Sequence, residues 1–493
     1  MDIKIGKFTL ETLTTGMYDS PKDMYREYIQ NGVDSIDNAV ELGLLSKGNE
    51  LISVDINKEL KTITITDNGT GIRSLEVNDL LLSIGSSKKL STKERGFRGV
   101  GRLAGLAYCD ELIFETSYKG EETKTKIVFN ANKLREELYS LDQESTIQQI
   151  LSEVTIVERE RETKGKHYFT VTLNGVADID GILNFEEIRT YLAQVAPVPF
   201  SPAFKWGEII RSKTHYLGYD ISEYNIVLKS NNQQFKLFKM YSDKFIADRL
   251  RKNSDSILDV DVNLICHNNY PLGILWYAKT NYSGTIQDNA TKSIRLRKGN
   301  IQLGTRATLN SVFKDERFNG WMIGELYILS NALIPNARRD DLEKNDTYYI
   351  LMDEMKAWAD SISSNIRKIS LARNAERVNT KLEEQVSRGD KISSVQLQQS
   401  ILPEIELTGK QEYDEIAHTE LINQLDLLIN QENKGTKYKI LNMQSGLTIE
   451  QKRILEAVFD VLCENEGNKA DSLISTIIKG YKEKLMVHST TII

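Results

Sequence analysis

The chain has 493 residues, of which 40% are hydrophobic and 27% charged, and its formal net charge is −7 at pH 7. This length exceeds what one hydrophobic core supports and indicates roughly two to four domains. No apolar run approaches the roughly 20 residues of a membrane-spanning helix, and the start, MDIKIGKFTLE, lacks the pattern of a signal peptide. The 3 cysteines and 5 histidines have no zinc-site spacing. We therefore expect a cytoplasmic protein that is not bound to a membrane and does not wrap nucleic acid wholesale.

The stretch from Ser20 to Gly43 predicts an amphipathic helix. Ser20 suits the N-cap, Pro21 the first helical position, Asp23 a capping box, and Gly43 the C-terminal stop. At about 100° per residue, one narrow polar sector of this helix carries Glu27, Asn31 and Asp34. The opposite side is apolar and is expected to pack, through Tyr25, Ile29, Ile36 and Val40.

Two glycine motifs follow this helix. Alternating runs from Leu51 to Ile56 and from Leu60 to Thr66 predict a β-hairpin that ends in DNGTGI, which places Asp67 beside Gly69 and Gly71. About thirty residues later comes a glycine-rich loop that opens into a helix start, a typical phosphate site because backbone amides and the helix dipole meet there. Its residues are Gly96, Phe97, Arg98, Gly99, Val100 and Gly101.

These three motifs, in this order, resemble the GHKL ATPase superfamily of gyrase, the ninety-kilodalton heat-shock chaperones, histidine kinases and MutL, with the MORC ATPases close by. The resemblance covers about the first 180 residues. It implies an α/β sandwich of the Bergerat type, with helices on one face of a mixed sheet, that binds ATP and Mg²⁺. It also implies that Asp67 accepts from the adenine amine and that Asn31 holds Mg²⁺. Glu27 would then act as the general base, and Asp34 belongs to the same nucleotide-binding face.

Three further assignments come from the resemblance. The polar, basic segment from Gly85 to Arg95 would be a lid over bound nucleotide, with Ser86, Ser87 and Lys88 resembling a Ser-x-Lys of MutL and MORC proteins; a solvated loop is the alternative. Chaperones contact adenine through a Gly-Thr, for which Thr170 is a possible substitute here. The segment from Ile3 to Leu10 is either an ordinary first strand or one that exchanges between protomers.

Patterns along the rest of the chain predict three domains, at residues 1–180, 181–345 and 346–493. Strands are expected at Glu111 to Tyr118, Thr125 to Asn130 and Tyr168 to Leu173, with a helical stretch from Ala131 to Val154. A helix from Phe185 to Val195 leads into a proline-rich boundary, Ala196 to Pro202. Two hairpins are expected after it, from Tyr224 to Met240 and from Ile257 to Ala278. This second domain resembles the ribosomal-S5-like transducer of the same superfamily.

The second domain offers two candidate cations for the γ-phosphate. The run from Asn336 to Asp340 resembles the chaperone motif that contains a catalytic arginine, which would be Arg339. Lys298, on a tight turn, could instead play the lysine that MutL and gyrase use. Beyond Asp340 the chain is predicted to be helical, with one long amphipathic helix from Thr347 to Leu371 that could continue to Gln385. Whether the later apolar stripes form intramolecular core or a coiled coil stays open.

The predicted function is ATP hydrolysis coupled to lid closure and to formation of a homodimer. A kinase is disfavoured because histidine kinases lack a glutamate base and because Met1 to Ser20 leaves no room for a phosphoacceptor helix. A degenerate scaffold is weakened because Glu27, Asn31 and Asp67 are all present. Two classes remain: a chaperone-like machine that remodels a protein client, and a MutL-like or MORC-like clamp on duplex DNA.

Overall fold

The computed structural model describes residues 20–82, 101–139, 147–230, 233–248, 253–387 and 458. The chain divides into two compact units, Met1–Arg367 and Lys368–Ile493, and the described residues lie mostly in the first. The expected N-terminal strand, the expected lid and the helices expected after Pro403 lie outside the described residues.

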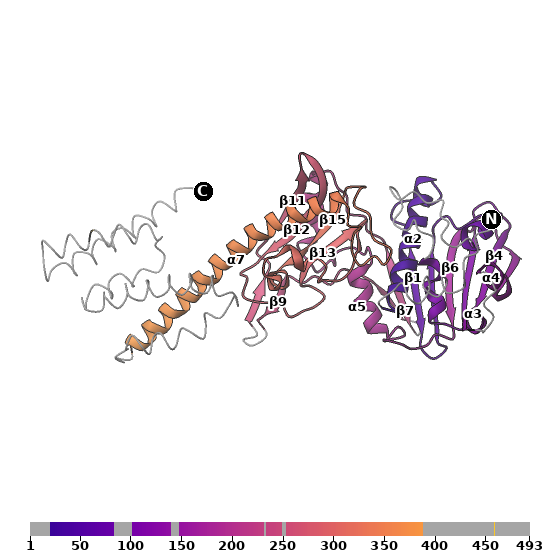
Figure 1. Cartoon of the computed structure of the whole chain (residues 1–493), viewed down its shortest axis with the longest axis horizontal. Helices are drawn as coiled ribbons and strands as arrows, with labels where there is room; N and C mark the ends of the chain where they lie inside the picture. The colour runs from indigo at the N-terminus through magenta and orange to yellow at the C-terminus, as the bar shows by residue number, and fades with distance from the viewer. Residues whose placement is uncertain are drawn as a thin grey trace. The chain divides into compact units, whose positions relative to one another are not determined.

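A mixed eight-stranded sheet forms the centre of the first half of this unit. Its strands lie in the order β5-β4-β3-β6-β2-β1-β7-β8 (Figure 1). Strands β1 and β7 pair in parallel, and the other neighbours pair antiparallel. The strands are β1 (Ile52–Asn57), β2 (Thr62–Asp67), β3 (Glu111–Ser117), β4 (Thr123–Asn130), β5 (Thr155–Arg161), β6 (Tyr168–Asn174), β7 (Ile226–Ser230) and β8 (Gln233–Lys236).

Helices cover one face of this sheet and leave the other polar. In β2, Ile63, Ile65 and Asp67 are buried on the helix-covered side, because alternate residues of a strand point to opposite faces. On the open side, Thr66 bonds to Thr170 across the β2–β6 pair, with 3.0 Å between the hydroxyl oxygens. The predicted α/β sandwich is therefore confirmed. The covering elements are α2 (Asp23–Glu41), η1 (Asn78–Leu82), η2 (Gly101–Ala107), α3 (Ala131–Tyr139), α4 (Ile147–Val154) and α5 (Phe185–Val195).

Helix α2 follows the sequence prediction except at its start. Tyr25, Ile29 and Ile36 are buried, and the helix ends before Gly43, which adopts a left-handed φ of 67°. The predicted N-cap is wrong, because the helix begins at Asp23 and its cap residue is Lys22, with no side-chain cap bond. The Ser20 hydroxyl instead accepts from the Lys22 amide at 3.3 Å within the preceding turn.

Two strands after the proline-rich boundary belong to the first sheet. The β1–β2 hairpin, strands β3, β4 and β6, and helix α5 lie where the sequence predicts them. Strand β7, expected in the second domain, pairs instead with β1 along Ile52 to Asp55, and β8 extends the same edge. The pairing of β1 with β7 is long-range and parallel, so the local pattern that predicts the strand carries no signal for its partner.

A second, five-stranded sheet follows, in the order β11-β12-β15-β13-β14. Helix α6 (Gly207–Tyr216) packs on one face through Ile210, and helix α7 (Asp346–Ser387) packs on the other through Leu351, Met355 and Ile362. Figure 1 shows α7 running along this sheet. The long helix is confirmed, including its continuation past Leu371. The likeness of this region to an S5-like domain stays a prediction. The strands are β11 (Asp259–His267), β12 (Tyr270–Lys279), β13 (Ser293–Lys298), β14 (Ile301–Gln302) and β15 (Ile323–Ile328); β9 (Lys244–Ala247) and β10 (Asn253–Ser256) form a separate ribbon.

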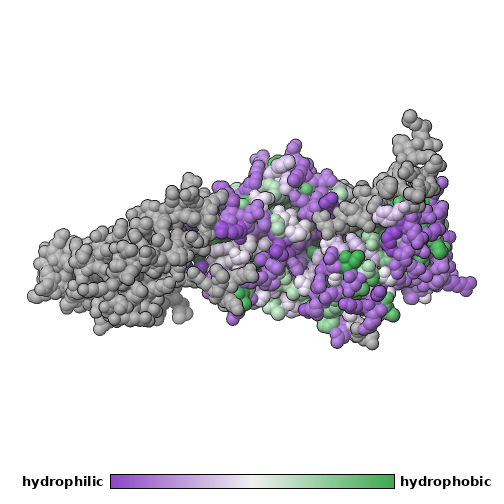
Figure 2. Space-filling model, turned by 60° about the horizontal axis from the view of Figure 1, so that its bottom comes forward, coloured by the Kyte–Doolittle hydropathy of each residue, from purple (hydrophilic) through white to green (hydrophobic). Residues whose placement is uncertain are grey.

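The face of the described residues in Figure 2 is largely hydrophilic, and hydrophobic residues form only small patches on it. Among the described residues, none of the helices combines the length and the apolar character that crossing a membrane requires.

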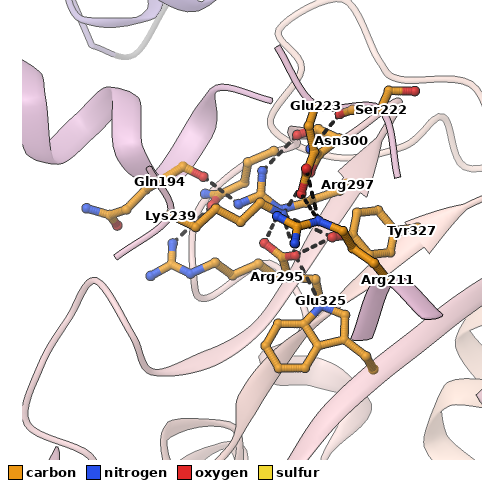
Figure 3. Close-up of polar contacts among 12 residues, drawn as sticks. Gln194, Arg211, Ser222, Glu223, Lys239, Arg295, Arg297, Asn300, Glu325 and Tyr327 are labelled. Atoms are coloured by element: carbon orange, nitrogen blue, oxygen red, sulfur yellow. Dashed lines mark hydrogen bonds and ion pairs between the residues drawn. The ribbon is translucent and has the colours of Figure 1, made fainter. Parts of the chain in front are cut away.

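A buried ionic cluster sits on the α6 face of the second sheet (Figure 3). Its centre is Glu325, which accepts from Lys239 at 2.6 Å, from the Trp276 indole at 3.1 Å and from the Arg297 guanidinium. Arg297 also donates to the carbonyl of Gln194 in α5 at 2.7 Å. The cluster therefore ties the second sheet to a helix of the first sheet.

Burial and the neighbouring charges shift the pKa values of Glu325 and Lys239 in this cluster. Burial by itself would raise the pKa of the Glu325 carboxyl, but Arg297 and Lys239 outweigh burial and hold that pKa well below its usual range. Burial, and next repulsion by Arg297, lower the pKa of Lys239 to about 7. The charged Glu325 carboxylate therefore stabilises the fold at pH values above its unfolded pKa of 4.5, and this stabilisation is lost as the pH falls below that value. The unfolded chain keeps the Lys239 proton up to pH 10.5, so stability from this group rises with pH between about 7 and 10.5.

We predict that Glu325→Gln destabilises the fold by about 3–5 kcal/mol, because it leaves Arg297 buried without its counter-ion. Lys239→Met should cost less, since Glu325 keeps its bonds to Arg297 and Trp276. Urea unfolding followed by tryptophan fluorescence measures the free energy of unfolding of this part of the chain, because all 4 tryptophans lie after α5. Asp353→Asn, in an ion pair whose aspartate side chain is 74% exposed, is the control and should have almost no effect. Equal losses for the two cluster variants would contradict the prediction.

Candidate active site

The site is built where helix α2 crosses the end of strand β2. Asp67, the last residue of β2, points to the helix-covered face and is 5% exposed. Gly32 of α2 lies directly against it: a Cβ at Gly32 would be 3.1 Å from the Asp67 Cβ and 3.4 Å from its Oδ2. The absence of a side chain at Gly32 therefore allows the helix and the strand to approach closely around a buried carboxylate.

The two glycines after Asp67 are required by close backbone contacts. The Gly69 amide donates to the Asp67 Oδ1 at 2.9 Å, and a Cβ at Gly69 would lie 2.1 Å from the Ser35 hydroxyl oxygen. Gly71 has a left-handed φ of 66°, and its Cβ would lie 1.9 Å from the Ser117 carbonyl oxygen. The loop that follows Asp67 is thus held between α2 and the end of β3, and the two glycines of the sequence motif make these close contacts possible.

One residue that sequence reasoning did not assign also holds this loop. The His167 Nδ1 lies 2.6 Å from the Gly69 carbonyl oxygen, so the imidazole donates to it. His167 comes just before β6, and the pairing of Asp67 with Phe169 brings it to the loop. The histidine has no motif spacing of its own, so only strand pairing reveals this contact.

The predicted general base is buried among arginines. Glu27 is 3% exposed, and its Oε1 lies 3.2 Å from the Arg339 Nε and 4.0 Å from the Arg26 Nε. The Arg26 Nη2 donates to the Arg338 carbonyl at 3.3 Å. Within the described part of the chain, no hydrogen bond reaches the Glu27 Oε1 despite these charges. The structure therefore brings Arg339 to Glu27, and the two predicted catalytic residues meet.

The other residues of the polar sector differ in exposure. Asp34 is 2% exposed, whereas Asn31, one turn after Glu27, is only half-buried. The amide of Asn31 is thus the accessible oxygen on this face of α2, next to a buried carboxylate. This is a suitable arrangement for one protein ligand to a hydrated cation.

Helix α2 also positions the segment that follows the glycine-rich loop. The Tyr28 hydroxyl donates to the Arg102 carbonyl at 3.1 Å and accepts from the Gly105 amide at 2.9 Å. The predicted helix after this loop is a short 3₁₀ helix, η2, which begins at Gly101. Burial lowers the pKa of the Arg102 guanidinium to about 10, so it keeps its charge at neutral pH. Gly96, Phe97, Arg98, Gly99, Val100 and the lid residues Ser86, Ser87 and Lys88 lie outside the described residues.

Two predicted site residues are not brought to this site. Thr170 pairs with Thr66, and its side chain lies on the open face of the sheet, opposite to Asp67. The side chain of Thr170 therefore does not share a face with Asp67, and the suggested adenine contact stays a prediction without support from strand register. Lys298 donates to the Ser330 carbonyl at 2.8 Å, and burial lowers its pKa to about 8. Among the described residues, Arg339 rather than Lys298 is the second-sheet cation beside Glu27.

Comparisons with known proteins agree with this geometry. Residues 20–163 match the family model described as "Histidine kinase-, DNA gyrase B-, and HSP90-like ATPase". The chain is similar to the chaperone protein HtpG of Vesicomyosocius okutanii subsp. Calyptogena okutanii, with 30% identity over 133 aligned residues; the match covers 23% of this chain and 22% of the relative.

HtpG of Polaromonas naphthalenivorans is 31% identical over 129 aligned residues, and the match covers 22% of this chain and 20% of that protein. HtpG of Halalkalibacterium halodurans is 29% identical over 134 aligned residues, and the match covers 24% of this chain and 21% of that protein. The chain thus spans about a fifth of the length of the curated relatives it matches. The matched segment contains Glu27, Asn31 and Asp67 together with the two glycines that hold the Asp67 loop. Residues 20–163 therefore match the ATPase domain of the GHKL superfamily, and the chain is similar at low identity to proteins of its chaperone branch.

Proposed function

We propose that this protein binds ATP with Mg²⁺, hydrolyses it to ADP and phosphate, and uses the cycle as a conformational switch that acts on a protein client. The observation that best supports this proposal is the position of the buried Asp67 carboxylate beside the helix that carries Glu27 and Asn31. Asp67 lies under α2 at Gly32, and the same helix carries Glu27 and Asn31 one turn apart.

Recognition of ATP would begin at Asp67. Its Oδ1 already accepts from the Gly69 amide, which orients the carboxylate. A carboxylate held in this way can accept from the exocyclic amine of adenine, whereas guanine presents a carbonyl at that position. Gly69 and Gly71 leave room for the flat base because neither has a side chain. His167 would support the pocket by holding the Gly69 carbonyl.

The residues of α2 fit a magnesium nucleotide. No group of three or more acidic, histidine or cysteine residues among the described ones could hold a metal by itself. Mg²⁺ commonly keeps several waters and takes one or two protein ligands plus substrate phosphates, so the Asn31 amide oxygen is a sufficient protein ligand. Bound Mg²⁺ would screen the phosphate charge and orient the phosphates for attack.

Hydrolysis would be performed by Glu27. A buried carboxylate one helical turn from Asn31 can orient a water molecule and accept its proton as the water attacks the γ-phosphorus. The bond from the γ-phosphorus to the bridging oxygen then breaks, and ADP leaves with the electron pair. Negative charge on the γ-phosphate needs cationic compensation, for which Arg339 is our candidate, with the backbone amide of Gly101 as a further donor.

A protein client is favoured over DNA by two observations. The relatives of the chain are named chaperone proteins, and the net charge of −7 disfavours a polyanionic partner.

The experiment that tests the function is the ATPase rate of the purified full chain alone, with an unfolded model protein and with duplex DNA. Stimulation by DNA alone would instead support the MutL-like or MORC-like clamp, and absence of any ATPase would refute the enzyme.

We predict that Asp67→Asn abolishes ATP binding, because the amide places a donor against the adenine amine. Glu27→Ala should bind ATP at least as tightly as wild type and lose at least about 100-fold in turnover, since it removes the proton acceptor. Calorimetry with the non-hydrolysable analogue AMP-PNP and a steady-state phosphate assay separate the two effects. Normal affinity in Asp67→Asn would rule out the adenine assignment.

We predict that His167→Ala weakens ATP binding by about two- to tenfold, the cost of losing one hydrogen bond that orders the Gly69 loop. Turnover at saturating ATP should change little, because His167 does not touch the phosphate side. His215→Ala, which removes an imidazole with a 76% exposed side chain from its pair with Asp220, is the matched control. A lower maximal rate with unchanged affinity would assign His167 to another role.

We predict that ATP, but not ADP, drives dimerisation or compaction of Glu27→Ala, because nucleotide can shift this equilibrium only by its differential affinity for the closed state. Light scattering measures the mass, and small-angle scattering measures the radius if the protein is already a dimer. Identical mass and radius with ATP, with ADP and without nucleotide would refute the switch.

A further inference from the structure

The pairing of Glu27 with Arg339 conflicts with the roles that hydrolysis requires of both residues. A general base must present its oxygen to water, and a phosphate-binding arginine must reach the phosphate. Instead the Glu27 Oε1 faces the Arg339 Nε at 3.2 Å. The two side chains are 4% and 13% exposed, so water screens the attraction only weakly. Each group is thus the ion-pair partner of the other.

The backbone around Arg339 is strained and tied to the second sheet. Arg339 adopts a left-handed φ of 58°, a conformation that non-glycine residues rarely adopt. Its carbonyl accepts from the Gly304 amide at 2.8 Å, just after strand β14. Within the loop, the Arg339 amide donates to the Asn336 carbonyl at 3.2 Å. The Arg26 bond to the Arg338 carbonyl adds a second contact to α2. Such strain persists only where surrounding contacts hold it.

We infer that the Glu27–Arg339 ion pair is a latch that keeps the chain inactive when no nucleotide is bound. The γ-phosphate of ATP opens this latch by competing with Glu27 for Arg339. The inference rests on the proposed ATP site. In the latched state Arg339 covers the base; in the loaded state Arg339 moves to the phosphate and leaves Glu27 to the water. The 336–340 loop is hydrogen-bonded to Gly304, just after β14 of the second sheet. Breaking the Glu27–Arg339 ion pair therefore removes a contact between this side of the second sheet and α2. Glu27 is thus free to bind the attacking water only when a nucleoside triphosphate is bound.

The bonding state of Glu27 supports a contact that must break. Glu325, the other buried glutamate at the junction of the two sheets, accepts several hydrogen bonds. The Glu27 Oε1 has ion-pair partners but no hydrogen bond within the described residues. An ion pair without a well-aligned hydrogen bond is weaker than one that has such a bond. The γ-phosphate, which carries more negative charge than a carboxylate, can therefore replace Glu27 as the partner of Arg339.

The test is a double-mutant cycle on AMP-PNP binding in the full chain. Wild type, Glu27→Ala, Arg339→Ala and the double variant are titrated with AMP-PNP and with ADP in the presence of Mg²⁺. Glu27→Ala should tighten AMP-PNP binding by about tenfold, because Arg339 no longer has to leave a partner. In the Arg339→Ala background the same change should shift affinity less than about twofold. ADP affinity should stay nearly constant, because ADP lacks the γ-phosphate.

The cycle separates the latch from simple charge removal. Losing the Glu27 carboxylate weakens repulsion of the phosphates whether or not Arg339 is present, so equal tightening in both backgrounds would overturn the latch. No tightening in Glu27→Ala would also overturn it. Glu41→Ala, which removes an exposed carboxylate from the end of the same helix, is the charge control. If wild type binds neither nucleotide, the proposed function fails, and this result differs from all outcomes of the cycle.

A second measurement does not depend on Arg339 variants folding. Hydrogen exchange of the peptide 336–341 should be several-fold faster in nucleotide-free Glu27→Ala than in wild type, because the latch no longer holds the loop against α2. Unchanged exchange of this peptide in Glu27→Ala would contradict the latch.

Discussion

The close approach of helix α2 to the end of strand β2 is the constraint on which the rest of the site depends. Burying the carboxylate of Asp67 costs free energy unless its oxygens are hydrogen-bonded. The Gly69 amide supplies one such bond, and Gly32 provides the space. Because α2 is held there, its Tyr28 reaches η2 and its Glu27 reaches the 336–340 loop. One helix thereby joins the loop after Asp67, the segment after the glycine-rich loop and the loop 336–340 beside the second sheet.

The two buried glutamates at the junction of the sheets illustrate how hydrogen bonding separates permanent from changeable contacts. Glu325 faces Lys239 and Arg297 and also accepts from Trp276, so its burial is compensated by both charge and hydrogen bonds. Removing a partner from such a cluster is costly, which makes it a fixed joint between α5 and the second sheet. Glu27 is equally buried but less completely bonded. The physical difference suggests that the first contact holds the architecture and the second can respond to a ligand.

Local sequence patterns determined the elements of this protein and the chemistry of its main motif. The period of apolar residues in α2, the alternation in β1 and β2 and the glycines after Asp67 are local signals, and the structure confirms the elements that they predict. The placement of Glu27 and Asn31 on one helix face also follows from helical geometry alone. These features depend on neighbours within a few residues, which is why a single sequence contains them.

Only the tertiary structure decided which distant groups meet. Strand register places Thr170 on the face opposite to Asp67, and it brings His167 to Gly69. Strand β7 joins β1 across more than 150 residues of chain, and Arg339 rather than Lys298 reaches Glu27. These outcomes follow from how sheets pair and how the second sheet packs on α2. Residue spacing carries no information about them, because the direction of a side chain and its partner are set by register and packing rather than by sequence distance.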